Sequence, residues 1–288
     1  MLGGLSLTWH WSPGTICFLL VLCLLYLFGL RRASTRKEQR GRIKVYHKVS
    51  FFSAIILMAL VLLTPIDTIA RTQLFSVHMA QAVILTTVCA PLVLLGCPAA
   101  LLDPFVKLPI IRILVRLFTR PLVASITFNL LFLLWHTPRL YHYALMNGSL
   151  YHVEMLSIFV ASLLNWWPLI GSVPELRRIS YPMQMLYAFF DGQPVDILAF
   201  VLVFSGTVVY PYYTVPLQMG ILPFPDQTAA GALLLIPGLV DLAVMSPLFI
   251  RWLGQIEQHT QLTDQKRQEQ AAAQEAELYE EVEVDEAD

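Results

Sequence analysis

The sequence predicts an all-α polytopic membrane protein, a bundle of about seven transmembrane helices with the N-terminus outside and the C-terminus in the cytoplasm. Three observations lead to this prediction. Hydrophobic residues make up 57% of the 288 residues and charged residues only 14%, whereas charged residues make up about 25% of an ordinary soluble domain. Long apolar runs recur along the chain. Basic residues alternate between the segments that separate these runs.

Seven apolar runs approach the length of about 20 residues that a helix needs to cross the hydrocarbon core of a bilayer. They cover residues 12–30, 50–66, 75–97, 121–136, 152–170, 183–210 and 228–253. The fourth run is the shortest, and six or eight spans are compatible with the same pattern. No basic residue precedes the first run, so we expect an uncleaved anchor and not a signal peptide.

The basic residues predict the orientation of the bundle. Seventeen of the 19 Lys and Arg residues lie in the first, third and fifth intervening segments, at the end of the last run or after it. Only Arg71 and Arg139 lie in the second and fourth segments. Because cytoplasmic loops carry the excess of Lys and Arg, the N-terminus is predicted outside and the C-terminus inside.

The chain is predicted to contain one membrane domain and a tail. Residues 1–255 form the helical bundle, and residues 256–288 form an acidic cytoplasmic segment. From Glu269 to Asp288 the tail carries nine acidic residues and no basic one. We expect this tail to be solvated, and either disordered or loosely helical, because it has no apolar core to bury.

The predicted orientation places five of the seven histidines near the outer face of the membrane. They are His10, His78, His136, His142 and His152. Four methionines are predicted at the same level, namely Met79, Met146, Met155 and Met219. Imidazole and thioether ligands suit copper, and His152 and Met155 share a helix face because they are three residues apart.

The resulting hypothesis is a transient copper site formed by His78, His136, His152 and Met155, with His142 and Asp226 as contributors. Labile ligation would suit an ion that is passed on. The structural alternative is that these histidines bond to helix ends or reach the membrane interface, and that the methionines only pack.

Three carboxylates are predicted inside the membrane: Asp191 and Asp196 in the sixth run, and Asp241 in the seventh. Ionisable groups at this depth are costly and usually face the bundle interior. They predict either a proton or cation site of a small-solute transporter, or hydrogen bonds that join helices near a break at Pro194. The sequence leaves both readings open.

The motifs of soluble enzymes are missing from the sequence. It contains no GxSxG, no HExxH, no P-loop and no glycine-rich dinucleotide turn, so we expect a protein that is not an enzyme. One alternative is an intramembrane metal-dependent enzyme with Glu154 as its general base. The lipid bilayer is an expected partner, and nucleic acid is not.

Several short motifs occur in order between about Phe75 and Arg251. They are His78-Met79-Ala80-Gln81, Ala90-Pro91, Leu95-Gly96, Trp135-His136-Thr137-Pro138 with Tyr141, Glu154, Trp166-Trp167-Pro168, Asp226-Gln227, Gly231 and Pro237-Gly238. In this respect the chain resembles the CtaG family of bacterial cytochrome c oxidase assembly factors. Many relatives carry His where this chain has Ala82 and Met155.

The resemblance implies a multi-pass protein of the bacterial cell membrane that serves the maturation of a caa-type oxidase. It also implies an accessory role in placing copper at the catalytic binuclear centre of that oxidase. The expected partners are haem-copper oxidase subunits and other copper chaperones. Gln81, Glu154 and Asp226 are motif residues of the family, and of these three only Asp226 is also predicted to contribute to the copper site.

Overall fold

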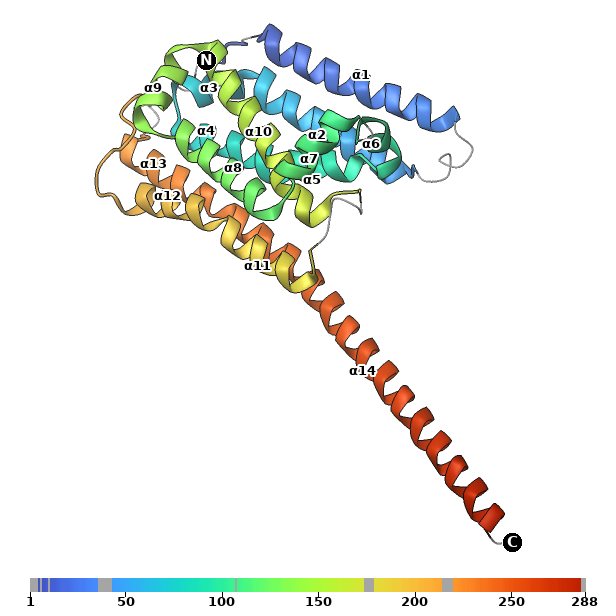
Figure 1. The fold of residues 1–288 in the computed structure, drawn as a ribbon. Helices are drawn as coiled ribbons and strands as arrows, with labels where there is room; N and C mark the ends of the chain where they lie inside the picture. The colour runs from blue at the N-terminus through green and yellow to red at the C-terminus, as the bar shows by residue number, and fades with distance from the viewer. Residues whose placement is uncertain are drawn as a thin grey trace.

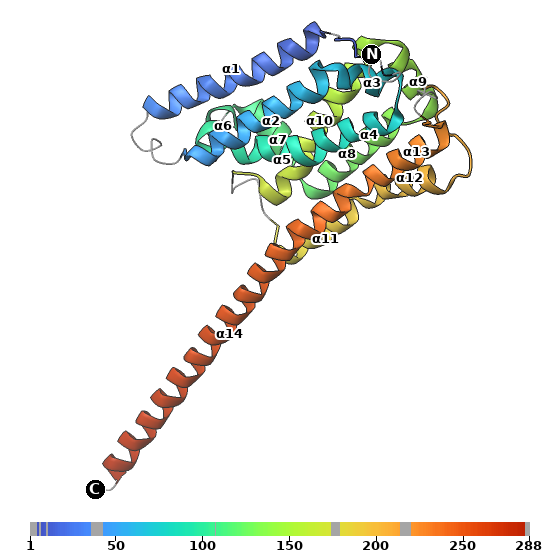
Figure 2. The same ribbon diagram turned by 180° about the vertical axis from the view of Figure 1, so that it is seen from behind.

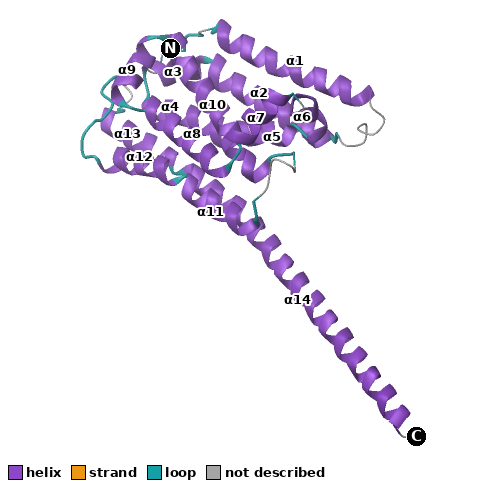
Figure 3. Cartoon of the chain, viewed as in Figure 1, coloured by secondary structure: helices purple, strands orange, loops and turns teal. Residues whose placement is uncertain are grey.

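The computed structural model describes residue 5 and residues 7–9, 11–35, 43–106, 108–173, 179–213 and 220–285. Within these ranges the chain forms helices that are joined by turns and loops (Figure 3). The helices pack side by side into a bundle, and one of them extends far beyond it (Figure 1).

Among the described residues, six helices or helix combinations are long and apolar enough to cross a membrane. They are α1 (Pro13–Thr35), α2 (Val45–Leu63), α4–η1–α5 (Phe75–Val83, Ile84–Cys89, Ala90–Gly96), α10 (Gly148–Ile170), α11–α12 (Tyr181–Asp191, Gln193–Phe204) and α13–α14 (Pro223–Leu234, Ile236–Asp285). A seventh span results if α7 (Pro109–Phe118) and α8 (Pro121–Trp135), which meet at 78°, are counted together. The predicted fold, an all-α membrane bundle of about seven spans, is confirmed.

Short helices occupy the two ends of the bundle. The helices α3 (Pro65–Thr72) and α9 (Pro138–Met146) lie at the end where the chain begins, which we call the α9 end (Figure 1). The helices α6 (Ala99–Val106) and α7 lie toward the opposite end, the α7 end, from which α14 leaves the bundle (Figure 2). The sequence analysis treated all four regions as connecting segments.

The sixth span ends earlier than predicted. Its helix stops at Phe204 instead of continuing to residue 210, because Gly206 adopts a positive φ of 67°, a conformation that commonly follows the last residue of a helix. The span is interrupted at Gly192. Pro194 follows in the first turn of α12, where its missing N–H costs no helical hydrogen bond.

Glycines allow two pairs of helices to pack closely. A Cβ atom on Gly96 of α5 would lie 2.9 Å from the backbone of Phe51 in α2. A Cβ atom on Gly231 of α13 would lie 2.8 Å from the carbonyl oxygen of Ala199 in α12. Small residues at such positions are typical of helix packing in membranes. These contacts hold α2, α5, α12 and α13 around the centre of the bundle.

The third span contains a π-helical segment, η1. Such segments leave carbonyl groups available for other donors. Here the indole Nε1 of Trp166 donates to the Thr86 carbonyl oxygen over 2.8 Å, which joins η1 to α10.

The helix α14 continues without interruption from the bundle to Asp285 and includes Pro247 (Figure 2). Most of the predicted acidic tail is therefore the end of this helix, while residues 286–288 lie outside the described part of the chain.

Candidate metal centre

Three buried side chains meet at the α9 end of the bundle. His78 comes from α4, His136 follows the last residue of α8, and Glu154 comes from α10. Their ligand atoms all lie within 4.8 Å of one another. His78 and Glu154 are 0% exposed and His136 is 2% exposed. This group of two imidazoles and one carboxylate has the composition and spacing of a metal centre.

A backbone carbonyl fixes the tautomer of His136. Its Nδ1 atom lies 2.7 Å from the carbonyl oxygen of Phe132, one turn earlier in α8. A carbonyl oxygen can only accept a hydrogen bond, so Nδ1 carries the proton. In a neutral imidazole the other nitrogen, Nε2, then presents a lone pair.

A chain of hydrogen bonds fixes the tautomer of His78 in the same way. Gln81 directs its amide nitrogen to the carbonyl oxygen of Val61, so its Oε1 must be the acceptor for the Tyr151 hydroxyl at 2.6 Å. The Tyr151 oxygen is then available to accept from Nδ1 of His78 at 3.1 Å. His78 therefore also presents the lone pair of Nε2.

The two lone pairs face each other beside a carboxylate. The Nε2 atoms of His78 and His136 are 3.3 Å apart, and Oε1 of Glu154 lies 3.7 Å from Nε2 of His78. Neither oxygen of Glu154 has a hydrogen-bond partner among the described residues. Buried carboxylates are costly unless they are paired or bind a metal. A proton between the nitrogens would leave Glu154 unsatisfied, whereas a cation would satisfy all three groups.

The spacing of the nitrogens fits a shared ion. Tetrahedral ligands that are about 2.0 Å from an ion lie about 3.3 Å from one another, and the two Nε2 atoms are 3.3 Å apart. Two imidazoles and one carboxylate also leave coordination positions open. The group can therefore bind an ion without enclosing it in a full set of protein ligands.

Aromatic rings surround the two imidazoles. The ring of Phe132 stacks on His136 with centroids 4.3 Å apart, and Tyr141 lies edge-on to His78 at 4.9 Å. Tyr210 donates to the carbonyl oxygen of His136, and the hydroxyl of Tyr213 contacts that of Tyr141. Burial, together with the charge of Asp226, raises the pKa of Tyr213 well above its usual value, so this residue stays neutral. The rings exclude water from the centre.

Local sequence signals place the two histidines of this group. The carboxylate of Asp226 in α13 accepts hydrogen bonds from the backbone nitrogens of Phe75 and Ser76 at 2.7 and 3.3 Å. It thus caps the start of α4, one turn before His78. In α8 the helix stops beside His136 because Pro138 disfavours helical backbone in the residue before it.

The structure places the other predicted ligands as follows. His152 lies with Nε2 3.3 Å from Oδ2 of Asp67 and Nδ1 2.6 Å from the carbonyl oxygen of Gly148. The His142 ring packs against Tyr212, with centroids 4.4 Å apart. Met155 is buried next to Glu154 in the chain. The group at His78 therefore does not include His142 or His152. His10 and Met219 lie outside the described residues.

The position of Glu154 beside the two histidines and the contact of Tyr151 with His78 were not predicted from the sequence. Glu154 is the only acidic residue between Gly148 and Ile170, and an ionisable group within a span predicts a functional role. The criterion that selected Asp191 would therefore have selected Glu154 as well. Tyr151 gives no comparable signal, because tyrosines are common in packed helices.

A second polar cluster lies farther from the α9 end, about three turns beyond Glu154 along α10 at Asn165, and involves the three predicted aspartates. Oδ2 of Asp191 accepts from Asn165 over 2.5 Å, and Oδ1 accepts from Asn129 over 3.1 Å. Tyr187 donates to Oδ1 of Asn165 over 2.6 Å. Asp191 of α11 is thereby joined to α8 and α10. Hydrogen bonds between helices were one of the two predictions for these aspartates, and they are present at Asp191.

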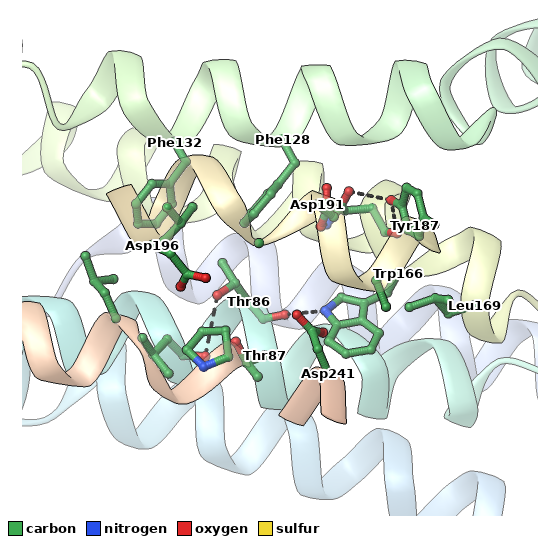
Figure 4. A pocket seen from close by; sticks show the side chains of 17 residues that line it. Thr86, Thr87, Phe128, Phe132, Trp166, Leu169, Tyr187, Asp191, Asp196 and Asp241 are labelled. Atoms are coloured by element: carbon green, nitrogen blue, oxygen red, sulfur yellow. Dashed lines mark hydrogen bonds between the residues drawn. The ribbon is translucent and has the colours of Figure 1, made fainter. Parts of the chain in front are cut away.

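Asp191, Asp196 and Asp241 line one cavity, as Figure 4 shows. A Cβ atom on Gly192 would lie 3.4 Å from Oδ2 of Asp241 and 3.8 Å from Oδ2 of Asp196, so these two carboxylates approach the same point. Phe132 also lines the cavity, and its ring stacks on the His136 ring. The Phe132 side chain therefore contacts both the cavity and the candidate metal centre.

A family model described as cytochrome c oxidase caa3 assembly factor (Caa3_CtaG) matches residues 24–255, which is well over half of the chain. The matched part contains His78, His136, Glu154 and all three aspartates. No match was found among the curated proteins or the solved structures.

Proposed function

Because this chain belongs to the family of cytochrome c oxidase caa3 assembly factors, we propose that it binds a copper ion transiently at His78, His136 and Glu154 and supplies it to the oxidase. The observation that carries this proposal is the convergence of two Nε2 lone pairs on a buried carboxylate that has no hydrogen-bond partner among the described residues. Copper is the cargo in this proposal, and no catalysed reaction is required of the protein.

The donor set supports copper and refines the earlier expectation. Imidazole ligands suit copper, and a carboxylate suits the oxidised ion better than a thioether does. We therefore place Cu²⁺ before Cu⁺ at this site, held nearer to a tetrahedral than to its usual square-planar geometry by two nitrogens that are 3.3 Å apart. Three protein ligands leave positions for a donor or acceptor ligand, so an ion can be exchanged between proteins without first becoming fully hydrated.

The location also supports delivery. The predicted orientation puts the α9 end, and with it the metal centre, toward the outside of a bacterial cell membrane. The resemblance implies that the copper of the catalytic binuclear centre lies toward the same side of the oxidase. Oxidase subunits and other copper chaperones would then meet the protein at its α9 end.

The function is tested by deleting the gene in its host and restoring it as wild type or as variants. Oxidase activity and the ratio of copper to haem in the purified oxidase are measured, together with the level of this protein. We expect deletion to lower activity and copper while haem stays constant. Unchanged copper and activity after deletion would exclude the proposed function.

The ligands are tested in the same strain. The pair His78→Ala and His136→Ala should reproduce the deletion at a normal protein level, and so should Glu154→Gln. The matched control is the pair His142→Ala and His152→Ala, which removes two histidines outside the group. If the control lowers oxidase copper as much as the test pair does, the ligand assignment is wrong.

One observation favours a second candidate, a carrier of protons or small cations. The cavity lined by Asp191, Asp196 and Asp241 offers about 50 Å³ to the centres of water molecules, and one water needs about 10–15 Å³ on this measure. The space suits a few waters or a small hydrated cation, and it is too small for a large organic solute. Cation uptake by vesicles that contain only this protein, abolished by Asp241→Asn, would support this candidate over copper delivery.

A further inference from the structure

The helix α7 differs from the other helices of the chain in how it uses its apolar residues. None of its residues is buried. Four large apolar side chains face outward, with exposed fractions of 72% for Ile110, 67% for Ile113, 49% for Leu114 and 43% for Leu117. A helix of 10 residues is about 15 Å long, too short to cross a bilayer. Its apolar face therefore needs another explanation.

The side chains of α7 divide into three faces. Each residue turns the helix by about 100°, so Ile110, Ile113, Leu114 and Leu117 share one side. Val115 lies on a second side and packs against the cluster of Leu94, Trp167 and Val173.

The third side is basic. Arg112 and Arg116 are both exposed and lie four residues apart, which places them on one helix face. Arg120, also exposed, follows at the same interval just before α8. The helix thus presents an apolar face and a row of guanidinium groups in different directions, while a third face is fixed to the bundle.

The direction of α7 accounts for this division. It meets α8 at 78°, and α8 runs within the bundle beside α10 (Figure 1). A helix nearly perpendicular to a transmembrane neighbour lies in the plane of the membrane surface. There, an amphipathic helix with Arg on its polar face inserts its apolar residues at the boundary between headgroups and acyl chains.

We propose that α7 is an interfacial helix that binds the headgroups of anionic phospholipids through Arg112, Arg116 and Arg120. Guanidinium groups bind phosphate oxygens with two parallel hydrogen bonds. The exposed isoleucines and leucines reach the acyl chains of the same lipids. A free phosphate ion has no acyl chain, so it would leave this apolar face uncovered. The α7 end is also the predicted cytoplasmic side, and the inference does not depend on the proposed copper site.

The test measures phosphatidylglycerol binding by native mass spectrometry of the full-length protein in detergent, titrated with this lipid or with phosphatidylcholine. Wild type should bind phosphatidylglycerol more tightly than phosphatidylcholine. The pair Arg112→Gln and Arg116→Gln should weaken phosphatidylglycerol binding by roughly fivefold per arginine, or about 30-fold together. The matched control is Lys266→Gln with Arg267→Gln, which removes the same charge from the part of α14 outside the bundle.

A second measurement tests the apolar face of α7, which the substitutions of arginine do not change. Ile113→Cys, in a chain whose four native cysteines are replaced by Ser, carries an environment-sensitive fluorophore in nanodiscs. Blue-shifted emission is expected, because residue 113 would lie among acyl chains. Equal lipid binding by the test pair and wild type would overturn the proposal, as would emission typical of water. The pair Arg112→Lys and Arg116→Lys keeps the charge and loses the paired hydrogen bonds, so it should bind phosphatidylglycerol more weakly than wild type and more tightly than the Gln pair.

Discussion

Two polar clusters lie inside the same apolar bundle and treat their carboxylates differently. Asp191 accepts hydrogen bonds from Asn129 and Asn165, so both of its oxygens have partners. Glu154 is more deeply buried, and neither of its oxygens has a partner among the described residues. The protein thus supplies hydrogen-bond donors to the acidic side chain in one cluster and, among the described residues, supplies none to the acidic side chain in the other.

The difference distinguishes a carboxylate that connects helices from a carboxylate that is available to bind a ligand. Hydrogen bonds to Asp191 connect α8, α10 and α11, and such a group contributes to the stability of the bundle. An unsatisfied carboxylate beside two lone pairs costs stability, and a cation would remove that cost. Four predictions test this distinction, and they are ordered by the size of the expected effect.

The largest effect is expected when a ligand is removed. Loss of a residue that only supports a metal ligand lowers metal affinity by up to roughly 100-fold. Loss of a ligand itself, by His136→Ala or Glu154→Gln, should lower Cu²⁺ affinity by more than that. Competition with a chelator, on protein in nanodiscs, measures this affinity. Glu154→Gln should leave the metal-free protein about as stable as wild type, because it replaces a buried carboxyl group that has no hydrogen-bond partner among the described residues with an amide of the same shape. A clear loss of stability with unchanged affinity would make Glu154 a structural residue.

Tyr151→Phe should have the next largest effect, because it removes the oxygen that accepts from Nδ1 of His78. The imidazole then loses the partner that fixes its tautomer, and Cu²⁺ affinity should fall roughly 10- to 100-fold. The exposed Tyr143 provides the matched control, Tyr143→Phe. The nitrogen hyperfine pattern in the electron paramagnetic resonance spectrum of bound Cu²⁺ should change for Tyr151→Phe alone. Unchanged affinity and spectrum would show that Tyr151 does not position His78.

Asp191→Ala should lower stability and leave Cu²⁺ affinity unchanged. Asn165 would lose the acceptor of its amide group, at a cost of about 1–3 kcal/mol for a buried group left unpaired, whereas Asn129 keeps the carbonyl oxygens of Ser125 and of residue 191 as acceptors. Thermal unfolding in nanodiscs measures the loss, with Asp264→Ala on the exposed part of α14 as the control. A fall in Cu²⁺ affinity at full stability would connect this cluster to the metal centre and contradict the distinction drawn here.

Asp226→Ala should have the smallest effect. It removes the cap of α4, which is worth about 1 kcal/mol of stability, and it loosens the first turn of the helix that carries His78. We expect a small decrease in melting temperature and a decrease in Cu²⁺ affinity smaller than that of Tyr151→Phe. Asp226→Asn keeps an acceptor oxygen and should recover most of the loss. An affinity loss as large as that of His136→Ala would instead make Asp226 a ligand.

The fold was largely predictable because the membrane requires long apolar runs. Each predicted run corresponds to a helix or helix combination of the bundle, and the shift at the end of the sixth run comes from Gly206. The short helices α3, α6, α7 and α9 were not predicted. They fall in the segments between runs, where hydropathy alone does not distinguish a helix from a loop.

The site was predictable only in part. His78 and His136 were expected at one level of the membrane, and the structure brings them together, while their binding of a metal stays a prediction. In α10, His152 and Glu154 are two residues apart and so point about 200° away from each other. Only one of them can face His78. A span that is apolar on all sides gives no pattern that identifies its inward face, and the sequence analysis chose His152.

The π-helical segment η1 allows the third span to contribute side chains to both polar clusters. A π turn contains an extra residue, so the side chains beyond it are rotated relative to those of an uninterrupted α-helix. Before η1 the span directs His78 and Gln81 to the metal centre, and within η1 it directs Thr86 and Thr87 to the cavity of the aspartates. The six residues of η1 thus set the angle, about the helix axis, between the side chains that face the two clusters. Deletion of one residue from η1 would rotate one set of side chains by about 100° relative to the other.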